Sequence, residues 1–133
     1  MSKGMNDRTS IQTVKVIRQI DPDDIDWNTR ENGQFVAGIL ELKTPREVEQ
    51  FLRDLMTPKE IKEFANRLEA ASLLSRDAQY NYITEKTGLS SATIARIKKW
   101  LEGSLGGYRL VLARLSKHAH NSSKLRKGLS LRT

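Results

Sequence analysis

Apolar residues recur every three or four positions between residues 35 and 115, which is the spacing of amphipathic α-helices rather than of strands. Glycine, proline and small polar residues interrupt the pattern at lengths typical of globular helices. The helices predicted in this way cover residues 34–43, 45–55, 58–74, 77–86 and 91–102, with a last one marked by residues 108–115. The sequence therefore predicts an all-α domain over residues 34–116.

Two of these helices begin with the same capping signal. Residues 44–47 (TPRE) and 57–60 (TPKE) each place a threonine before a proline, with a glutamate three residues after the threonine. The threonine hydroxyl can accept a free backbone N–H, the proline suits the first helical position, and the glutamate can reach back to the cap. For the helix at 77–86 we expect Ser75 to be the cap.

Residues 1–33 form a predicted extension outside this helical pattern. Segment Ile11–Ile20 is rich in β-branched residues, which favour a strand, but its apolar positions also suit a helix, so both structures stay open. The acidic segment 21–24 contains a proline, which argues against a helix at this point of the chain. Trp27 stands among polar residues, and we expect it to anchor the extension onto a partner or onto the domain.

The most informative stretch, residues 82–97, has the spacing of a helix-turn-helix. Gly88 can adopt the left-handed conformation that a tight turn needs. Ser90 or Ser91 can cap the second helix, whose apolar stripe begins with Ile94. Two helices that cross at about 90–120° across a short glycine turn require this arrangement.

The second helix of this motif has a small, basic face opposite its apolar stripe when it is drawn at about 100° per residue. Arg96 on that face can bond guanine O6 and N7 or a phosphate, although a lone surface arginine is more often only solvated. Hydroxyl groups at the start of the helix can donate to phosphates, helped by free backbone N–H groups. The predicted DNA-binding residues are Lys86, Ser90, Ser91, Ala92, Thr93, Ala95, Arg96 and Lys99.

The charge distribution strengthens this interpretation. The net charge of the 133 residues is +7, but residues 1–66 carry a net −2 and residues 67–133 a net +9. From Lys86 onward there are 11 basic residues and a single acidic one, Glu102. A one-sided excess of cations is the electrostatic signature of a protein that binds a polyanion, although a basic face can also serve solubility alone.

Other functional classes find little support in the composition. The chain has no cysteine, which excludes disulfides and zinc fingers, and we expect no metal and no cofactor. His118 and His120 lie outside any catalytic constellation, so no enzyme is predicted. No signal peptide or membrane-length apolar run is visible, and a cytoplasmic, nucleoid-associated protein is expected.

The segment 117–133 is basic and polar, and its composition predicts a disordered tail. Two roles remain open for it. The cations can follow DNA phosphates, or they can simply keep the protein in solution.

Residues from about 34 to 115 resemble the Trp repressor superfamily, and most of all its short YerC/YecD-type members. Three blocks carry the resemblance, with matching order and spacing: 55–60 (LMTPKE), 66–71 (NRLEAA) and 87–96 (TGLSSATIAR). The resemblance implies an all-α, intertwined homodimer that binds specific double-stranded DNA and regulates transcription, as a repressor, in bacteria. A two-fold dimer would place two recognition helices about one DNA turn apart.

The family's corepressor site carries over only in part. Arg67, Thr93 and Arg96 match the positions that would hold a ligand. The family's glycine after the second arginine is Ile97 here, and its serine three residues later is Trp100. We expect these bulky side chains to occupy the space of an indole, with the Trp100 ring filling the cavity, so tryptophan is not the predicted effector. Arg67 is then expected to pair with Glu63 one helical turn away, which is a weak surface interaction.

The main alternative to a DNA-binding regulator is a protein-interaction or adaptor dimer that keeps the fold without reading DNA. The segment 8–27 makes this alternative credible, because it can add a strand to a partner or bind a second protein. The dependence of DNA affinity on salt, and on sequence, separates the two functions.

Overall fold

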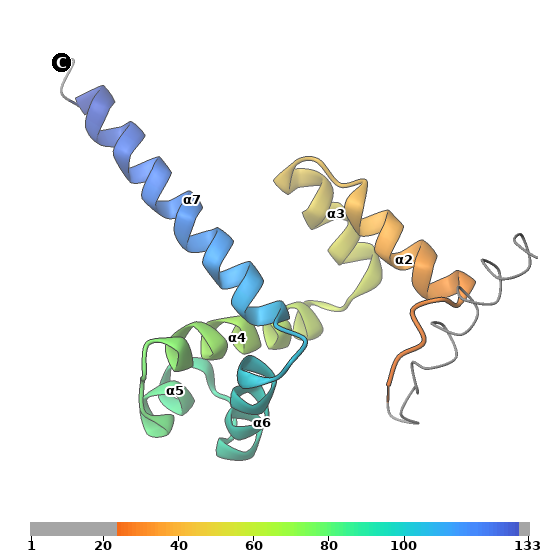
Figure 1. Ribbon diagram of the computed structural model, residues 1–133, viewed down its shortest axis with the longest axis horizontal. Coiled ribbons are helices and arrows are strands. Elements are labelled where there is room, and N and C mark those ends of the chain that lie inside the picture. Colours follow the sequence, from red (N-terminus) through yellow and green to blue (C-terminus); the bar gives the residue numbers. More distant parts are fainter. Residues whose placement is uncertain (1–23, 131–133) are drawn as a thin grey trace, which may run out of the picture. The chain divides into compact units, whose positions relative to one another are not determined.

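A computed structural model describes the backbone of residues 24–130 and the side chains of residues 24–123 (Figure 1). This part of the chain contains six helices and no strand, so the predicted all-α fold is confirmed. The helices are α2 (Arg30–Leu40), α3 (Pro45–Leu55), α4 (Pro58–Ser75), α5 (Tyr80–Thr87), α6 (Ser91–Glu102) and α7 (Gly107–Ser130). The chain divides into two compact units at residues 50 and 51, and the second unit contains α4 to α7. The expectation for Ile11–Ile20 lies outside the described residues.

Helix α2 begins four residues before the predicted start at residue 34. Thr29 is its N-cap, and the Thr29 hydroxyl accepts the backbone N–H of Asn32 at 3.2 Å. Gly33, where the sequence pattern predicted a break, lies inside the first turn and a half of the helix. The cap therefore decides where the helix starts, because it satisfies a free N–H group and so offsets the poor helix propensity of one glycine.

The two predicted capping signals differ in how completely they form. At α4 the box is complete: the Thr57 hydroxyl accepts the Glu60 N–H at 3.2 Å, and the Glu60 carboxylate accepts the Thr57 N–H at 2.8 Å. The hydrogen bonds from Thr57 lower the pKa of the exposed Glu60 carboxyl. At α3 only the first half forms, with the Thr44 hydroxyl accepting the Glu47 N–H at 3.2 Å.

The predicted start of α5 at Asp77, with Ser75 as its cap, is wrong. Ser75 is the last residue of α4, and α5 begins at Tyr80. Asp77 has a positive φ of 60°, and the N–H of Ala78 returns to the carbonyl of Leu73 at 3.1 Å. This left-handed reversal satisfies the last carbonyl groups of α4, so the helix stops there, and four residues separate it from α5.

The hydrophobic core lies in the second unit, where α4, α5 and α6 pack together. Ala70 and Ala71 of α4 are fully buried, as are Ile83 of α5 and Ile94 and Ile97 of α6. The two alanines carry small side chains, which lets α5 and α6 approach α4 closely. The apolar stripe predicted for residues 94–101 is therefore confirmed as the buried face of α6.

Helix α7 corrects another prediction from the sequence. Residues 117–130, for which the composition predicted a disordered tail, form the second half of this helix. Between residues 108 and 127 the chain has neither proline nor glycine, and it includes good helix formers such as alanine, leucine, lysine and arginine. Polar composition alone therefore did not distinguish a disordered tail from a solvated helix. Among the described residues, no helix has the length and apolar character needed to cross a membrane.

Candidate nucleic-acid interface

Helices α5 and α6 are joined by the tight turn that the sequence predicts. Gly88 has φ 73° and donates its N–H to the Thr84 carbonyl at 2.8 Å. The buried Thr87 hydroxyl donates to the Ile83 carbonyl at 2.7 Å and accepts the Leu89 N–H at 3.3 Å. These bonds fix the turn from inside, so α6 leaves it in a defined direction.

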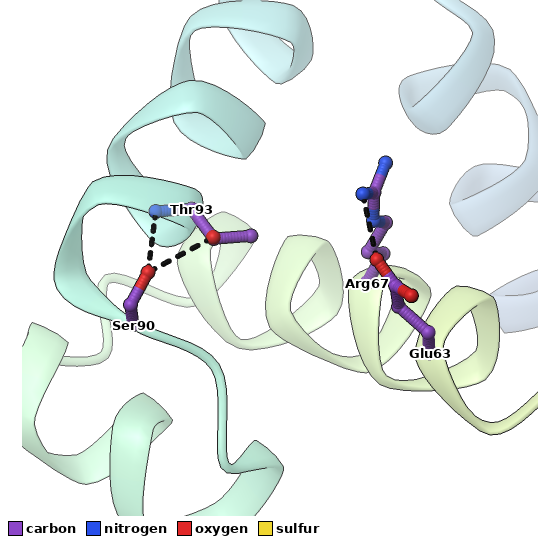
Figure 2. Close-up of polar contacts among 4 residues, drawn as sticks. All are labelled: Glu63, Arg67, Ser90 and Thr93. Atoms are coloured by element: carbon purple, nitrogen blue, oxygen red, sulfur yellow. Dashed lines mark hydrogen bonds and ion pairs between the residues drawn. The ribbon is translucent and has the colours of Figure 1, made fainter. Parts of the chain in front are cut away.

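The start of α6 is capped by Ser90. Figure 2 shows the Ser90 hydroxyl oxygen between two groups of Thr93: it accepts the Thr93 N–H at 3.2 Å and lies 2.9 Å from the Thr93 hydroxyl oxygen. One of the two hydroxyl hydrogens is used within this pair, so the other remains available to a ligand. Helical geometry also leaves the backbone N–H groups of Ser91 and Ala92 without a carbonyl partner inside the helix. Together these donors make the start of α6 suitable for a phosphate.

The outer face of α6 is open. Ala92, Ala95, Arg96 and Lys99 are all exposed, opposite the buried stripe that begins at Ile94. Arg96 makes no hydrogen bond or ion pair with any residue in the described part of the chain. Its guanidinium group is therefore uncommitted, and the small side chains of Ala92 and Ala95 leave a close approach to this face unobstructed.

Lys86 lies at the end of α5, before the turn. Its ammonium group is 5.6 Å from the centre of the Tyr82 ring one helical turn earlier. An exposed cation over an aromatic face is attracted by about 0.5–1 kcal/mol, which restricts the side chain while its charge stays exposed. The predicted site residues thus come from the end of α5 and the first three turns of α6.

Arg67 takes no part in this surface. Its guanidinium group pairs with the Glu63 carboxylate at 2.9 Å, as the sequence predicted, and lies 5.4 Å from the centre of the Phe64 ring. Figure 2 shows the Arg67–Glu63 pair on α4 and Thr93 on α6, with no bond between them. Arg67 is therefore engaged by Glu63 and makes no hydrogen bond to Thr93, the other of these two residues that Figure 2 labels.

The expectation for the two bulky residues of α6 is half right. Ile97 is fully buried in the core, but the expectation that the Trp100 ring fills a cavity is wrong, because this side chain is 45% exposed. Trp100 instead lines an open, largely apolar pocket of about 770 Å³ with Leu68 of α4 and Tyr108 of α7. Lys99 also lines this pocket, in the last turn of α6.

Two features of this region have no clear signal in the sequence. The pocket joins residues that are about 40 positions apart, so only the packing of α7 on α4 and α6 creates it. Arg109 donates a short hydrogen bond to the Leu101 carbonyl and so ties the start of α7 to the end of α6. A Cβ atom at Gly106 would lie 3.0 Å from this guanidinium group, and the positive φ of Gly106 also favours glycine.

Comparison with known proteins identifies the fold. The sequence model of the Trp repressor protein family matches residues 31–116. The chain belongs to this family. It is a family of helix-turn-helix transcription regulators rather than of enzymes, and α5 and α6 are the helix-turn-helix of this member.

Relatives support the assignment along most of the chain. The uncharacterised protein YerC of Bacillus subtilis (strain 168) is 37% identical over 94 residues, which cover 71% of this chain and 90% of YerC. The crystal structure of a TrpR-like protein from Eubacterium eligens ATCC 27750 has a TM-score of 0.64 and 37% identity, and covers 68% of this chain and 93% of its own. A candidate Trp repressor from Staphylococcus aureus has a TM-score of 0.63 at 30% identity, covering 67% and 89%.

Proposed function

We propose that the protein is a sequence-specific, double-stranded DNA-binding regulator of transcription that acts as a homodimer through α5 and α6. In this proposal residues 34–116 form the DNA-binding domain, and residues 1–33 are an extension to it. Repression is the proposed mode of control because the family is that of the Trp repressor. A dimer of this kind works in the cytoplasm, at the nucleoid.

The outer face of α6 carries this proposal. It combines uncommitted donors at the capped start of the helix, small side chains in its first turns, and the free guanidinium group of Arg96. We propose that hydroxyl and N–H groups at Ser90, Ser91 and Thr93 bind phosphates. Arg96 contacts a base edge, and the small side chains of Ala92 and Ala95 leave room for this approach. Lys86 and Lys99, at the two ends of the surface, add sequence-independent attraction.

Homodimer formation is supported by the apolar surface of the first two described helices. Neither α2 nor α3 has a buried residue. Val36 and Ile39 of α2 are 41% and 49% exposed, and Val48 of α3 is 38% exposed. Removal of such apolar area from water stabilises a complex by about 25 cal/mol per Å², so a second copy of the chain would gain by covering these faces.

We propose that tryptophan does not control this regulator. Ile97 is packed in the core where the resemblance implies a glycine, and Arg67 is engaged by Glu63. A ligand that needs both guanidinium groups would have to break the pair with Glu63 and would meet a buried branched side chain. Such a site lacks the preformed polar contacts that small-molecule pockets provide.

The test begins with selection of bound sites from random duplexes by the full-length protein. Affinity for the selected duplex and for a scrambled one is then measured over a range of salt concentrations. We expect the selected site to bind at least about 10³-fold more tightly at physiological salt. Equal affinity for the two duplexes would overturn the proposal and favour an adaptor dimer that does not read sequence.

The substitution Arg96→Ala tests whether DNA binds at the proposed surface of α6. We expect it to weaken binding to the selected site by about 1–3 kcal/mol and to relax selectivity at one base position. Lys98→Ala is the matched control, because Lys98 is an exposed cation of the same helix outside the proposed face. Equal effects of the two substitutions would remove Arg96 from direct readout.

A further inference from the structure

Two aromatic rings among the described residues lie against a cation, and the two cations differ in whether their charge is neutralised. On α4 the Arg67 guanidinium group lies 5.4 Å from the centre of the Phe64 ring, and it also pairs with the Glu63 carboxylate. On α5 the Lys86 ammonium group lies 5.6 Å from the centre of the Tyr82 ring, and it makes no ion pair with any residue in the described part of the chain. The charge of Lys86 therefore remains available to a partner molecule.

The sequence of α5 explains why the ring is the neighbour of this ammonium group. In a helix, side chains three or four residues apart are neighbours, whereas adjacent side chains do not face each other. The residues three and four positions before Lys86 are Ile83, which is fully buried, and Tyr82. The nearest acid, Glu85, is the adjacent residue, so it does not face Lys86. Tyr82 is therefore the helical neighbour that can attract the cation.

The pair of Tyr82 and Lys86 is open to solvent. The Tyr82 side chain is 46% exposed, and Lys86 is exposed as well. An ammonium group carries three N–H donors, and a ring on one side of it leaves donors on the other side free. A second partner can therefore bind Lys86 while the ring stays in contact with it.

The place of Lys86 in the helix-turn-helix favours a phosphate as this second partner. Lys86 lies in the last turn of α5, four residues before Ser90, which caps α6. In a helix-turn-helix the second helix enters the major groove and the first helix crosses the phosphate backbone. Lysine acts as a point charge rather than as a planar fork, so it binds a phosphate without reading a base.

We propose that Tyr82 is a positioning residue for DNA binding, whose ring holds the Lys86 ammonium group where the phosphate backbone crosses α5. This inference rests on the proposed function and deepens it, because it names a residue that acts through Lys86. A lysine side chain loses much rotational freedom when a ligand immobilises it. The ring imposes part of this loss in the free protein, so less remains to be lost on binding. The gain is the same for every duplex.

The experiment is a double-mutant cycle in the full-length protein, with Tyr82→Leu, Lys86→Gln and the double variant. Binding to a labelled duplex of mixed sequence is measured over a range of salt concentrations. We expect Tyr82→Leu to weaken binding about two- to five-fold per subunit, the worth of an exposed cation–π contact. The slope of log affinity against log salt should not change, because the charge remains. Lys86→Gln should lower this slope by about 0.9 per subunit.

The decisive measurement is the effect of Tyr82→Leu in the Lys86→Gln background, where we expect no further loss of affinity. A purely structural role of Tyr82 would instead weaken binding equally with and without Lys86. Tyr82→Phe is the matched control, because it keeps the ring and should bind DNA as the wild type does. Lys62→Gln removes an exposed cation of α4 outside the proposed surface and should change the salt slope clearly less than Lys86→Gln does.

Three outcomes overturn the inference while the selected site is still preferred over a scrambled one. Equal losses from Tyr82→Leu in the two backgrounds would show that Tyr82 does not act through Lys86. A loss in Tyr82→Phe as large as in Tyr82→Leu would assign the contact to the hydroxyl group itself. Tighter binding by Tyr82→Leu would show that the ring competes with the phosphate for Lys86.

Failure of the proposed function gives a different result. Selection from random duplexes would then yield no preferred site, whereas the cycle on the mixed duplex still reports whether Tyr82 and Lys86 are coupled. A coupled pair without a preferred site would leave the inference standing as a sequence-independent contact. A wild-type protein that does not bind the mixed duplex even at low salt would overturn both proposals.

Discussion

The hydroxyl oxygens of Ser90 and Thr93 lie 2.9 Å apart at the start of α6, and the Ser90 oxygen also accepts the Thr93 backbone N–H at 3.2 Å. The residue that caps the proposed recognition helix is therefore bonded to one of the proposed phosphate-binding residues. A change at Ser90 should consequently affect both the stability of the helix and the position of Thr93.

Ser90→Ala should destabilise the protein by about 1 kcal/mol, because it leaves a free N–H group at the helix start without its acceptor. Urea unfolding in the absence of DNA measures this effect. Ser91→Ala is the control, because the Ser91 hydroxyl is exposed and forms no hydrogen bond among the described residues. Equal stability of the two variants would contradict the role assigned to the Ser90 cap.

Gly88→Ala should also destabilise the turn, by about 1–2 kcal/mol. A Cβ atom at Gly88 would contact nothing within 4 Å, so the cost comes from the positive φ of 73° alone. Gly88→Asn should cost less, because asparagine tolerates the left-handed region better than alanine. Thermal unfolding measures these effects. Gly107→Ala, at an equally open position without a positive φ, should be tolerated in this assay.

Ile39→Asp should weaken the proposed dimer. Ile39 is 49% exposed on the apolar side of α2, and a carboxylate there would have to lose its hydration when a second copy covers this face. Sedimentation velocity over a range of protein concentrations measures the monomer fraction. Gln34→Asp, on the opposite side of the same helix, is the control. A dimer of unchanged stability in the Ile39 variant would place the subunit contact elsewhere.

The capping box at α4 predicts a specific dependence of stability on pH. The Thr57 N–H and hydroxyl lower the pKa of the Glu60 carboxyl from its usual value of 4.5. A lowered pKa in the folded state means that this interaction contributes stability above that value and loses it as the pH falls below it. Wild-type protein should therefore exceed Glu60→Gln in stability at pH 7, and the difference should shrink at pH 3. A difference that is constant with pH would exclude the ionised carboxylate as its source.

Titration with tryptophan should produce no binding heat and no rise in DNA affinity. The reason is the buried position of Ile97 together with the Arg67–Glu63 pair at 2.9 Å. Isothermal calorimetry and DNA titration with and without the amino acid provide the measurement. Micromolar binding would show that Arg67 exchanges its partner and that α4 and α6 leave room for an indole.

Much of the candidate site could be predicted from the sequence because its signals are local. Glycine at 88 and serine at 90 act within one turn of their own position, so they fix the end of α5 and the start of α6 without help from distant residues. The apolar spacing of Ile94, Ile97 and Leu101 likewise defines the buried face of α6, and hence its outer face. The all-α class follows from the same period.

Only the tertiary structure decided the features in which two local signals compete or distant residues meet. Ser75 could end α4 or begin α5, and the left-handed reversal at Asp77 settled this by satisfying the carbonyl groups of α4. Trp100 could enter the core or line its edge, and the position of α7 left it half exposed in a pocket. The sequence determined which segments of residues 34–116 are helical, because capping and periodicity act over a few residues. Packing decided the rest, because the burial of a side chain depends on elements far away in the chain.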